Sequence, residues 1–250
     1  MSIKKPVLAV LSLAFILILG GGIYVLTQIN ALAKPLVEDI ASDVLGVDVA
    51  IGEMDTRLKE RKVFVRNIEI DNPAGFSKPH VMTIEDVTVS LDAIAQDSVD
   101  INDVTVQGSD IYLEVTPQGT NLSRLQKNIQ ESKGEGPVED AIRVIVKRFA
   151  LNNATVHPSV TLVSSRDVKP LNLPPIVLTG IGTKENGVQA RDAVAQIMQP
   201  ILRRVIEQAG DAGYYEGLSP EALKEMGLSE FDQIKTQINE EVDRLKGMFE

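Results

Sequence analysis

Cysteine and tryptophan are both missing from this chain, and aromatic side chains make up only 4% of its 250 residues. Without cysteine, a disulfide framework and a thiolate metal site are excluded, so stability has to come from burial. The scarcity of aromatic rings leaves little surface for stacking bases or sugars. The two histidines, His80 and His157, lie in turn-like contexts beside prolines and have no second ligand at metal spacing. We therefore expect no metal and no cofactor.

The chain also lacks the motifs that catalysis requires. Nucleophile elbows and phosphate-binding loops are absent, and no acid-rich stretch has the ligand spacing and central glycine of a calcium loop. Three of the 25 basic residues precede Glu38, the first acidic residue, which leaves 22 basic and 35 acidic residues beyond position 34 and a net charge of −13 there. Such a surface repels phosphate backbones. We expect a non-enzymatic protein that does not bind nucleic acid.

A long uncharged run opens the chain, because the twenty residues from Val7 to Leu26 include no charged side chain. As a helix this run is about 30 Å long, which matches the hydrocarbon core of a bilayer. Lys4 and Lys5 precede the run and only Lys34 follows it closely, so the positive-inside tendency places the N-terminus in the cytoplasm. An exported chain without cysteine fits a bacterial periplasm. We expect residues 1–30 to form a cytoplasmic tip and a single-pass inner-membrane anchor, with the bulk of the chain in the periplasm.

A cleaved signal peptide is the alternative interpretation of this run. Ala31-Leu32-Ala33 offers a small-x-small site after the apolar stretch. However, the run is longer than the usual signal-peptide core of about 7 to 15 residues, and Lys34-Pro35 is an unfavourable context for cleavage. Both interpretations export the remainder of the chain.

Hydrophobic periodicity divides that remainder into helices and strands. Apolar residues recur every three or four positions from Ala31 to Val44, which predicts a helix that Gly46 ends. Leu122, Leu125 and Ile129 share one face of a predicted short helix, capped by Asn121. Short β-branched runs predict strands at residues 63–70, 81–91, 99–106, 111–115, 142–156 and 176–183. Turns are predicted at residues 71–76 and 107–110.

The helical period returns after Gly187, where Val194, Ile197, Ile201 and Val205 form one stripe that Pro200 is expected to kink. Two further helix starts are predicted at residues 219 and 229.

These elements predict an α+β fold in which a transmembrane helix precedes an antiparallel sheet with one inserted helix, followed by C-terminal helices. We place the sheet domain and its leading helix at residues 31–187 and the C-terminal helical region at residues 188–250. Alternating residues give each strand one apolar and one wet face. The ordinary account is a half-buried sheet covered by the C-terminal helices. The alternative is a curved sheet whose concave aliphatic face stays partly open, a lining that suits acyl chains.

Four segments of the sequence carry a family resemblance. They are VRNIEIDNPAGF at residues 65–76, the strand at 84–91, the strand pair at 99–115 and Asn121-Leu122. As a set they resemble the N-terminal region of AsmA-like proteins, in which a membrane-anchored start leads to a strand with an N-P-x-G-F turn, further strands and an N-L helix. The resemblance covers residues 1–128 well and 142–209 loosely. The matching positions are Asn72, Pro73, Gly75, Phe76, Asp92, Glu114, Asn121 and Leu122.

This resemblance implies a curved antiparallel β-groove of the kind found in bridge-like lipid transfer proteins. It implies an inner-membrane-anchored periplasmic protein that takes part in phospholipid delivery toward the outer membrane and in envelope homeostasis. Contact with phospholipid acyl chains would come from the apolar groove lining and not from catalytic side chains. We assign to that lining Phe64, Ile68, Val87, Val89, Leu91, Val104, Val106, Ile111, Leu113 and Val115.

The length of the chain limits what such a groove can do. Eight or nine strands at a spacing of about 4.8 Å extend only about 40 Å, too short to bridge two membranes. We therefore expect the protein to hold or hand over phospholipid near the inner membrane, or to support a longer conduit. The alternative is a structural or scaffolding envelope protein that binds a partner through its C-terminal helices. The residues of that expected partner-binding stripe are Phe231, Ile234, Ile238, Val242 and Leu245.

Overall fold

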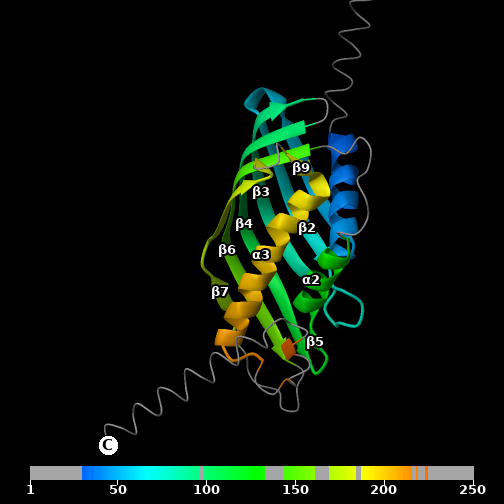
Figure 1. Ribbon diagram of the computed structural model, residues 1–250, viewed down its shortest axis with the longest axis vertical. Helices are drawn as coiled ribbons and strands as arrows, with labels where there is room; N and C mark the ends of the chain where they lie inside the picture. The colour runs from blue at the N-terminus through cyan, green and yellow to red at the C-terminus, as the bar shows by residue number, and fades with distance from the viewer. Residues whose placement is uncertain are drawn as a thin grey trace, which may run out of the picture.

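One open, curved sheet forms the centre of the molecule (Figure 1). The computed structural model describes residues 30–95, 98–132, 143–160, 169–183, 187–215, 218 and 223–224. Its nine strands follow the order β1-β2-β3-β4-β6, and β7, β8 and β9 pair one after another along the far edge of β6. The strands are β1 Val49–Arg57, β2 Lys62–Asp71, β3 His80–Ile94, β4 Ser98–Thr116, β5 Gly119–Thr120, β6 Arg143–Val160, β7 Leu171–Leu173, β8 Ile176–Ile181 and β9 Val188–Gln189.

The α+β fold expected from the sequence is confirmed, but the sheet is narrower than expected. Because three strands share one edge of β6 and β5 only extends the hairpin after β4, the sheet is six strands wide. At the usual strand spacing this is about 24 Å across instead of about 40 Å.

The expectation of a purely antiparallel sheet is wrong at one pair of strands. β4 and β6 run parallel along their whole shared length, from Ser98 opposite Arg143 to Val115 opposite Val160. Their connection contains the helix α2 (Asn121–Ser132), so the chain returns to the starting end of the sheet before β6 begins. Strand periodicity carries no information about strand direction, which is why the sequence pattern did not reveal this pair.

A second difference concerns residues 107–110, which were expected to be a turn but lie inside the continuous strand β4. Gly108 there has a left-handed backbone, with φ of 66°. The strand register places it in line with two further left-handed residues, Asn67 of β2 and Asn153 of β6, both with φ of 52°. Such a residue interrupts the two-residue alternation of a strand. On each strand, the residues that face inward therefore shift by one position at this level, which we call a phase change. Because neighbouring strands make this shift at the same level, their hydrogen-bonded pairing continues on both sides of it.

The phase change is visible in the burial pattern of β4. Val104 and Val106 are buried before Gly108, whereas Ile111 and Leu113 are buried after it, so the inward positions change from even to odd numbers. A turn-like glycine therefore bends the sheet without ending the strand.

Helices cover the concave face of the sheet. α3 (Ala190–Asp211) crosses this face diagonally, and α2 lies beside the lower part of the sheet (Figure 1). α3 confirms the helix predicted after Gly187 and continues through Pro200. Its buried side chains join the sheet in one hydrophobic cluster, so the described parts of residues 31–187 and 188–250 share a core. These buried side chains are Ala193, Ala195, Met198, Ile201, Leu202, Val205, Ile206 and Ala209.

The helix predicted from Ala31 is also present, and its described residues, 30–45, lie along β1 (Figure 1). Gly46 ends it as predicted, with φ of 64° and its N–H donating to the carbonyl of Ser42 at 2.8 Å. Side chains of this helix accept hydrogen bonds from the free edge of β1, which keeps that edge from pairing with another strand. The donors are the N–H groups of Val49, Ile51 and Thr56, and the acceptors are Ser42 Oγ at 2.9 Å, Glu38 Oε1 at 2.7 Å and Asn30 Oδ1 at 3.0 Å.

Several sequence expectations fall on residues that the structure does not describe, among them the helix starts predicted at residues 219 and 229. Within the described ranges no helix has the length and apolarity needed to span a bilayer. The uncharged run at residues 7–26 lies outside those ranges, as does the stripe from Phe231 to Leu245.

Candidate functional site

The concave face of the sheet is built from rows of apolar side chains that run across the strands. Strand pairing places residues from neighbouring strands opposite one another on the same face. One row joins Met54, Val65, Val87, Val106 and Leu151. The row on the other side of the left-handed residues joins Val49, Ile70, Met82, Ile111 and Val156. This face is the candidate site for an apolar ligand.

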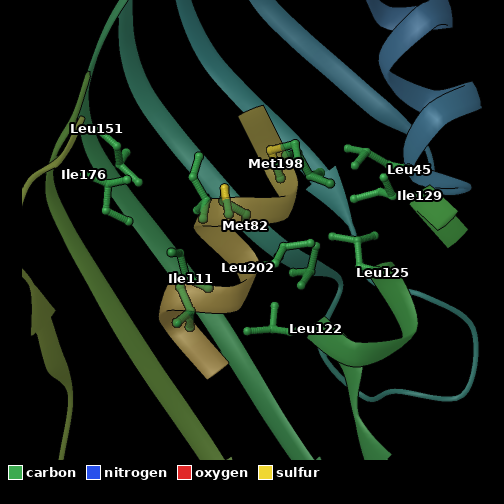
Figure 2. Packing of buried hydrophobic residues seen from close by; sticks show 14 of the residues in the cluster. Leu45, Met82, Ile111, Leu122, Leu125, Ile129, Leu151, Ile176, Met198 and Leu202 are labelled. Carbon is green, nitrogen blue, oxygen red and sulfur yellow. The ribbon is translucent and has the colours of Figure 1, made fainter. Parts of the chain in front are cut away.

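Helices close the lower part of this face. Figure 2 shows Leu202 of α3 and Leu122 and Leu125 of α2 gathered against Ile111 and Met82 of the sheet. Five of the residues assigned to an accessible lining lie instead in the buried hydrophobic cluster that the sheet shares with α2 and α3. They are Val104 and Val106, at 9% and 4% exposure, and the fully buried Ile111, Leu113 and Val115.

Several aliphatic side chains of β2 and β3, and one of β4, are only half-buried on this face. Ile68, Val87 and Val89 of the predicted lining belong to this group, and Ile84 and Ile101 join them. We call these five residues the aliphatic strip. Ile101 pairs with Leu91 of β3. The strip therefore extends along β3 from Ile84 to Leu91, a distance of about 23 Å. Ile84 and Ile101 were missed because each lies three residues, and not two, from the next inward-facing residue of its strand. A strict two-residue alternation would place both on the outer face.

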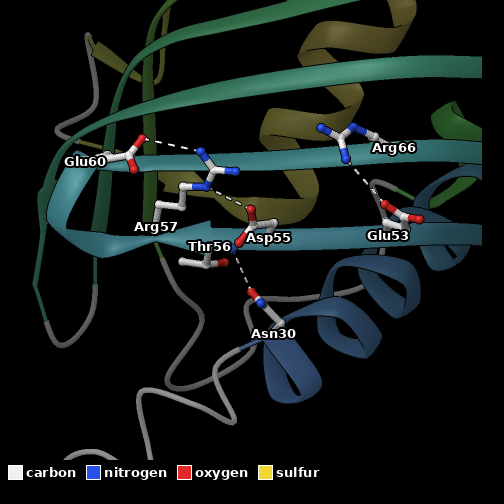
Figure 3. A network of polar contacts seen from close by, with 7 residues as sticks. All are labelled: Asn30, Glu53, Asp55, Thr56, Arg57, Glu60 and Arg66. Carbon is white, nitrogen blue, oxygen red and sulfur yellow. Dashed lines mark hydrogen bonds and ion pairs between the residues drawn. The ribbon is translucent and has the colours of Figure 1, made fainter.

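Phe64 does not belong to the concave face. It pairs with Asp55 of β1, and the guanidinium of the exposed Arg57 lies 4.7 Å from the centre of its ring. This outer face also carries the ion pairs of Arg57 and Arg66 (Figure 3). The assignment of Phe64 to the lining is wrong because the left-handed Asn67 changes the phase of β2, so Val65 and not Phe64 shares a face with Ile68.

Leu91 is the other predicted lining residue that departs from the pattern. The β3–β4 register shifts on both sides of it, and it lies outside the hydrophobic cluster although it is half-buried. It therefore marks the end of the aliphatic strip without contributing to its packing.

A buried carboxylate organises the loop at the opposite end of the sheet. Glu114, at 5% exposure, accepts hydrogen bonds from the backbone N–H of Ser77 at 2.9 Å and of Lys78 at 2.8 Å. The Ser77 hydroxyl and the Asn72 side-chain amide also donate to it. Burial by itself raises the pKa of Glu114, but these donors outweigh it and hold the pKa below its ordinary value.

Asn121 extends this network and does not cap α2 as predicted. Its Oδ1 accepts from the backbone N–H of Glu114 at 2.9 Å, and its Nδ2 donates to Tyr112 O at 2.7 Å and to Asn72 Oδ1 at 3.0 Å. The helix is capped by Thr120 and Ser123, whose hydroxyls accept each other's backbone N–H at 3.0 and 3.1 Å.

Asn72, Glu114 and Asn121 are positions of the family resemblance, but their meeting was not predictable from the sequence, because they lie up to 49 residues apart. Each of them has its polar atoms engaged by other protein groups, so we interpret the cluster as a clamp on the loop at residues 72–79.

His80 and His157 each lie beside an aspartate. Across the described ranges no group of three or more histidine, aspartate or glutamate side chains is placed to hold an ion. His80 Nδ1 lies 3.0 Å from Asp71, and His157 Nε2 lies 2.7 Å from Asp110. His157 lies within β6, not in a turn, and its ring stacks on Tyr112. Both histidines therefore pair with a carboxylate.

No protein-family model matches this chain, and searches of curated proteins and of solved structures return no significant match.

Proposed function

We propose that this chain is an AsmA-like, inner-membrane-anchored periplasmic protein that binds phospholipid and hands it over in cell-envelope lipid transport, without enzymatic chemistry. The observation that carries this proposal is the aliphatic strip, which continues the hydrophobic core along the concave face but stays half-buried. The resemblance at residues 65–76 and the uncharged run at residues 7–26 support the family and the anchor.

The driving force for binding would be the removal of acyl methylene groups from water. Each buried methylene contributes about 0.8 kcal/mol, so a few contacts along the strip are enough to retain a chain that is already at the membrane. No bond is made or broken in such an exchange. Because α2 and α3 pack against the lower part of the face, the strip would contact part of a lipid and would not form a continuous conduit.

Native mass spectrometry of the full chain in mild detergent tests this proposal. Val89 lies on the strip, whereas the next residue, Ser90, pairs with Asp103 on the outer face. We expect the unaltered chain to retain phospholipid, Val89→Asp to retain at least one molecule fewer, and Ser90→Asp to match the unaltered chain. Lipid that surrounds the anchor is common to all three proteins and cancels in the comparison. Equal lipid content in all three folded proteins would contradict the proposal.

A further inference from the structure

One end of the sheet combines three features that lie far apart in the sequence. The 3-10 turn η1 (Leu58–Glu60) joins β1 to β2 there, and β3 meets β4 at the same end. The β1–β2 turn contacts β3 near that end, since the N–H of Leu91 donates to Arg61 O at 2.8 Å. The helix at residues 30–45 starts at this end too, where Asn30 Oδ1 accepts from the N–H of Thr56 (Figure 3). We call this the proximal end.

Exposed aliphatic side chains gather at the proximal end. Ile94, beside the β3–β4 turn, is 58% exposed. Leu32, two residues after Asn30, is 69% exposed. Leu36 and Val37, at 45% and 43% exposure, lie further along the helix, beside Glu38, which contacts Ile51 near the start of β1. Within the described ranges only Val177 is a further large exposed hydrophobic side chain. Large apolar side chains that lie together at a protein surface mark a contact with a partner or a membrane.

Basic residues concentrate at the same place in a chain whose net charge is −10. Four of the six residues from Arg57 to Lys62 are basic. Arg57 pairs with Asp55 and Glu60, and Arg61 donates to the carbonyl of Asp92. Lys59 and Lys62 are exposed, and neither has an ion pair among the described residues. These two ammonium groups are available to an anionic partner.

Asp92 and Asp55 are paired with basic side chains near this turn, whereas Asp100, at the same end, forms no ion pair among the described residues. The Asp92 carboxylate lies 2.6 Å from Lys147 Nζ, and Asp55 lies 2.9 Å from Arg57. Exposed pairs of this kind are weak, but they neutralise two carboxylates that would otherwise oppose an approaching anion.

Chain length restricts how far the proximal end can lie from the anchor. Leu26, the last residue of the uncharged run, precedes Asn30 by four positions. Four residues span about 6 Å as a helix and at most about 14 Å when extended. If the run crosses a bilayer, Asn30 and the turn that contacts it lie within that distance of the hydrocarbon boundary, which is the depth of lipid headgroups.

We propose that the proximal end is a membrane-contacting surface that binds a bilayer rich in anionic phospholipid. Leu32 and Ile94 enter the interfacial region, and Lys59 and Lys62 pair with headgroup phosphates. The inference rests on the anchor of the proposed function and deepens it. It sets the strands end-on to the membrane, so that the Ile101 end of the aliphatic strip faces the lipid that it would take up.

The composition of the chain allows a direct test with a single fluorophore, since tryptophan is absent. In Ile94→Trp the indole lies at the proximal end. Val177→Trp is the control, because Val177 is also exposed, at 52%, but lies elsewhere on the sheet. Val177 pairs with Ala150 of β6, and Val144 of the same strand pairs with Val99 at the proximal end. The six residues between Ala150 and Val144 place Val177 about 20 Å from the proximal end. The full chain is reconstituted into vesicles of phosphatidylcholine and phosphatidylglycerol whose acyl chains are brominated.

We expect brominated lipid to quench Ile94→Trp at least twofold more than Val177→Trp, with a blue-shifted emission for Ile94→Trp alone. Adding Lys59→Glu and Lys62→Glu should reduce the quenching in vesicles with phosphatidylglycerol and leave it unchanged in pure phosphatidylcholine. Leu32→Trp repeats the test should Ile94→Trp misfold. Equal quenching at positions 94, 32 and 177 overturns the proposal. Lipid retention by native mass spectrometry is a separate measurement, so failure of the contact is distinguishable from failure of lipid binding.

Discussion

Leu113→Asp is expected to unfold the domain. Leu113 is fully buried on β4 beneath α2 and α3, so aspartate would place an unpaired carboxylate where no water reaches it. Removing a buried leucine side chain alone costs about 2 to 5 kcal/mol, and an unpaired buried charge adds several more. This sum is comparable with the whole stability of a typical domain, about 5 to 15 kcal/mol. Circular dichroism and urea denaturation of the purified chain measure the effect.

Val89→Asp provides the contrast on the neighbouring strand. Val89 shares the concave face with Val104 but is half-buried, so its carboxylate can reach water. We expect a cooperative unfolding transition with a loss of about 1 to 2 kcal/mol. A well-folded Leu113→Asp protein, with the same urea midpoint as the unaltered chain, would show that the helices do not close this face.

Glu114→Gln is expected to destabilise the protein by about 2 to 3 kcal/mol at pH 7. Hydrogen bonds to an ionised carboxylate are stronger than those to a neutral amide. The amide NH2 group of glutamine would also face N–H and O–H donors, from which it cannot accept a hydrogen bond. Glu114 is buried and receives four donors from Asn72, Ser77 and Lys78. The loop at residues 72–79 should lose hydrogen-exchange protection first, since the carboxylate holds it.

The pH dependence gives this prediction a definite sign. The pKa of Glu114 is lowered in the folded protein, whereas the pKa of a glutamate in an unfolded chain is about 4.3. Its contribution to stability is therefore complete above the unfolded pKa and is lost as the pH falls through the folded pKa. The stability gap between the unaltered chain and Glu114→Gln should be largest at pH 7 and should shrink below about pH 4. A gap that stays constant over this range would mean that the ionised form is not the one the loop requires.

The sequence pattern was sufficient for the elements that periodicity and local turn chemistry determine. The helix ending at Gly46, the strands with β-branched runs and α2 follow from side-chain spacing and lie close to the predicted ranges. The direction of β6 was not predictable, since alternation is the same for parallel and antiparallel strands. Gly108 was misinterpreted because a left-handed glycine is compatible both with a turn and with a bend inside a long strand.

The candidate site was predictable only in part for the same reason. Ile68, Val87 and Val89 were assigned to the concave face, where they line the aliphatic strip. The phase change at Asn67 moved Phe64 to the outer face, and a fixed two-residue period could not reveal this. Tertiary packing decided the remainder: α3 was recognised as a helix, but its position over Ile111 depends on contacts between distant segments. The ordinary account of a sheet covered by a C-terminal helix therefore holds for the lower part of the face.

Photo-crosslinking on β3 tests the lipid-binding strip most directly. A diazirine side chain at Val87 would point along the concave face, whereas one at Thr88, the next residue, would point outward beside Phe64 and Thr105. After irradiation of the full chain in its native membrane, the account predicts phospholipid-sized mass adducts at position 87 and few or none at position 88. Equal labelling at the two positions, or none at position 87, would contradict it.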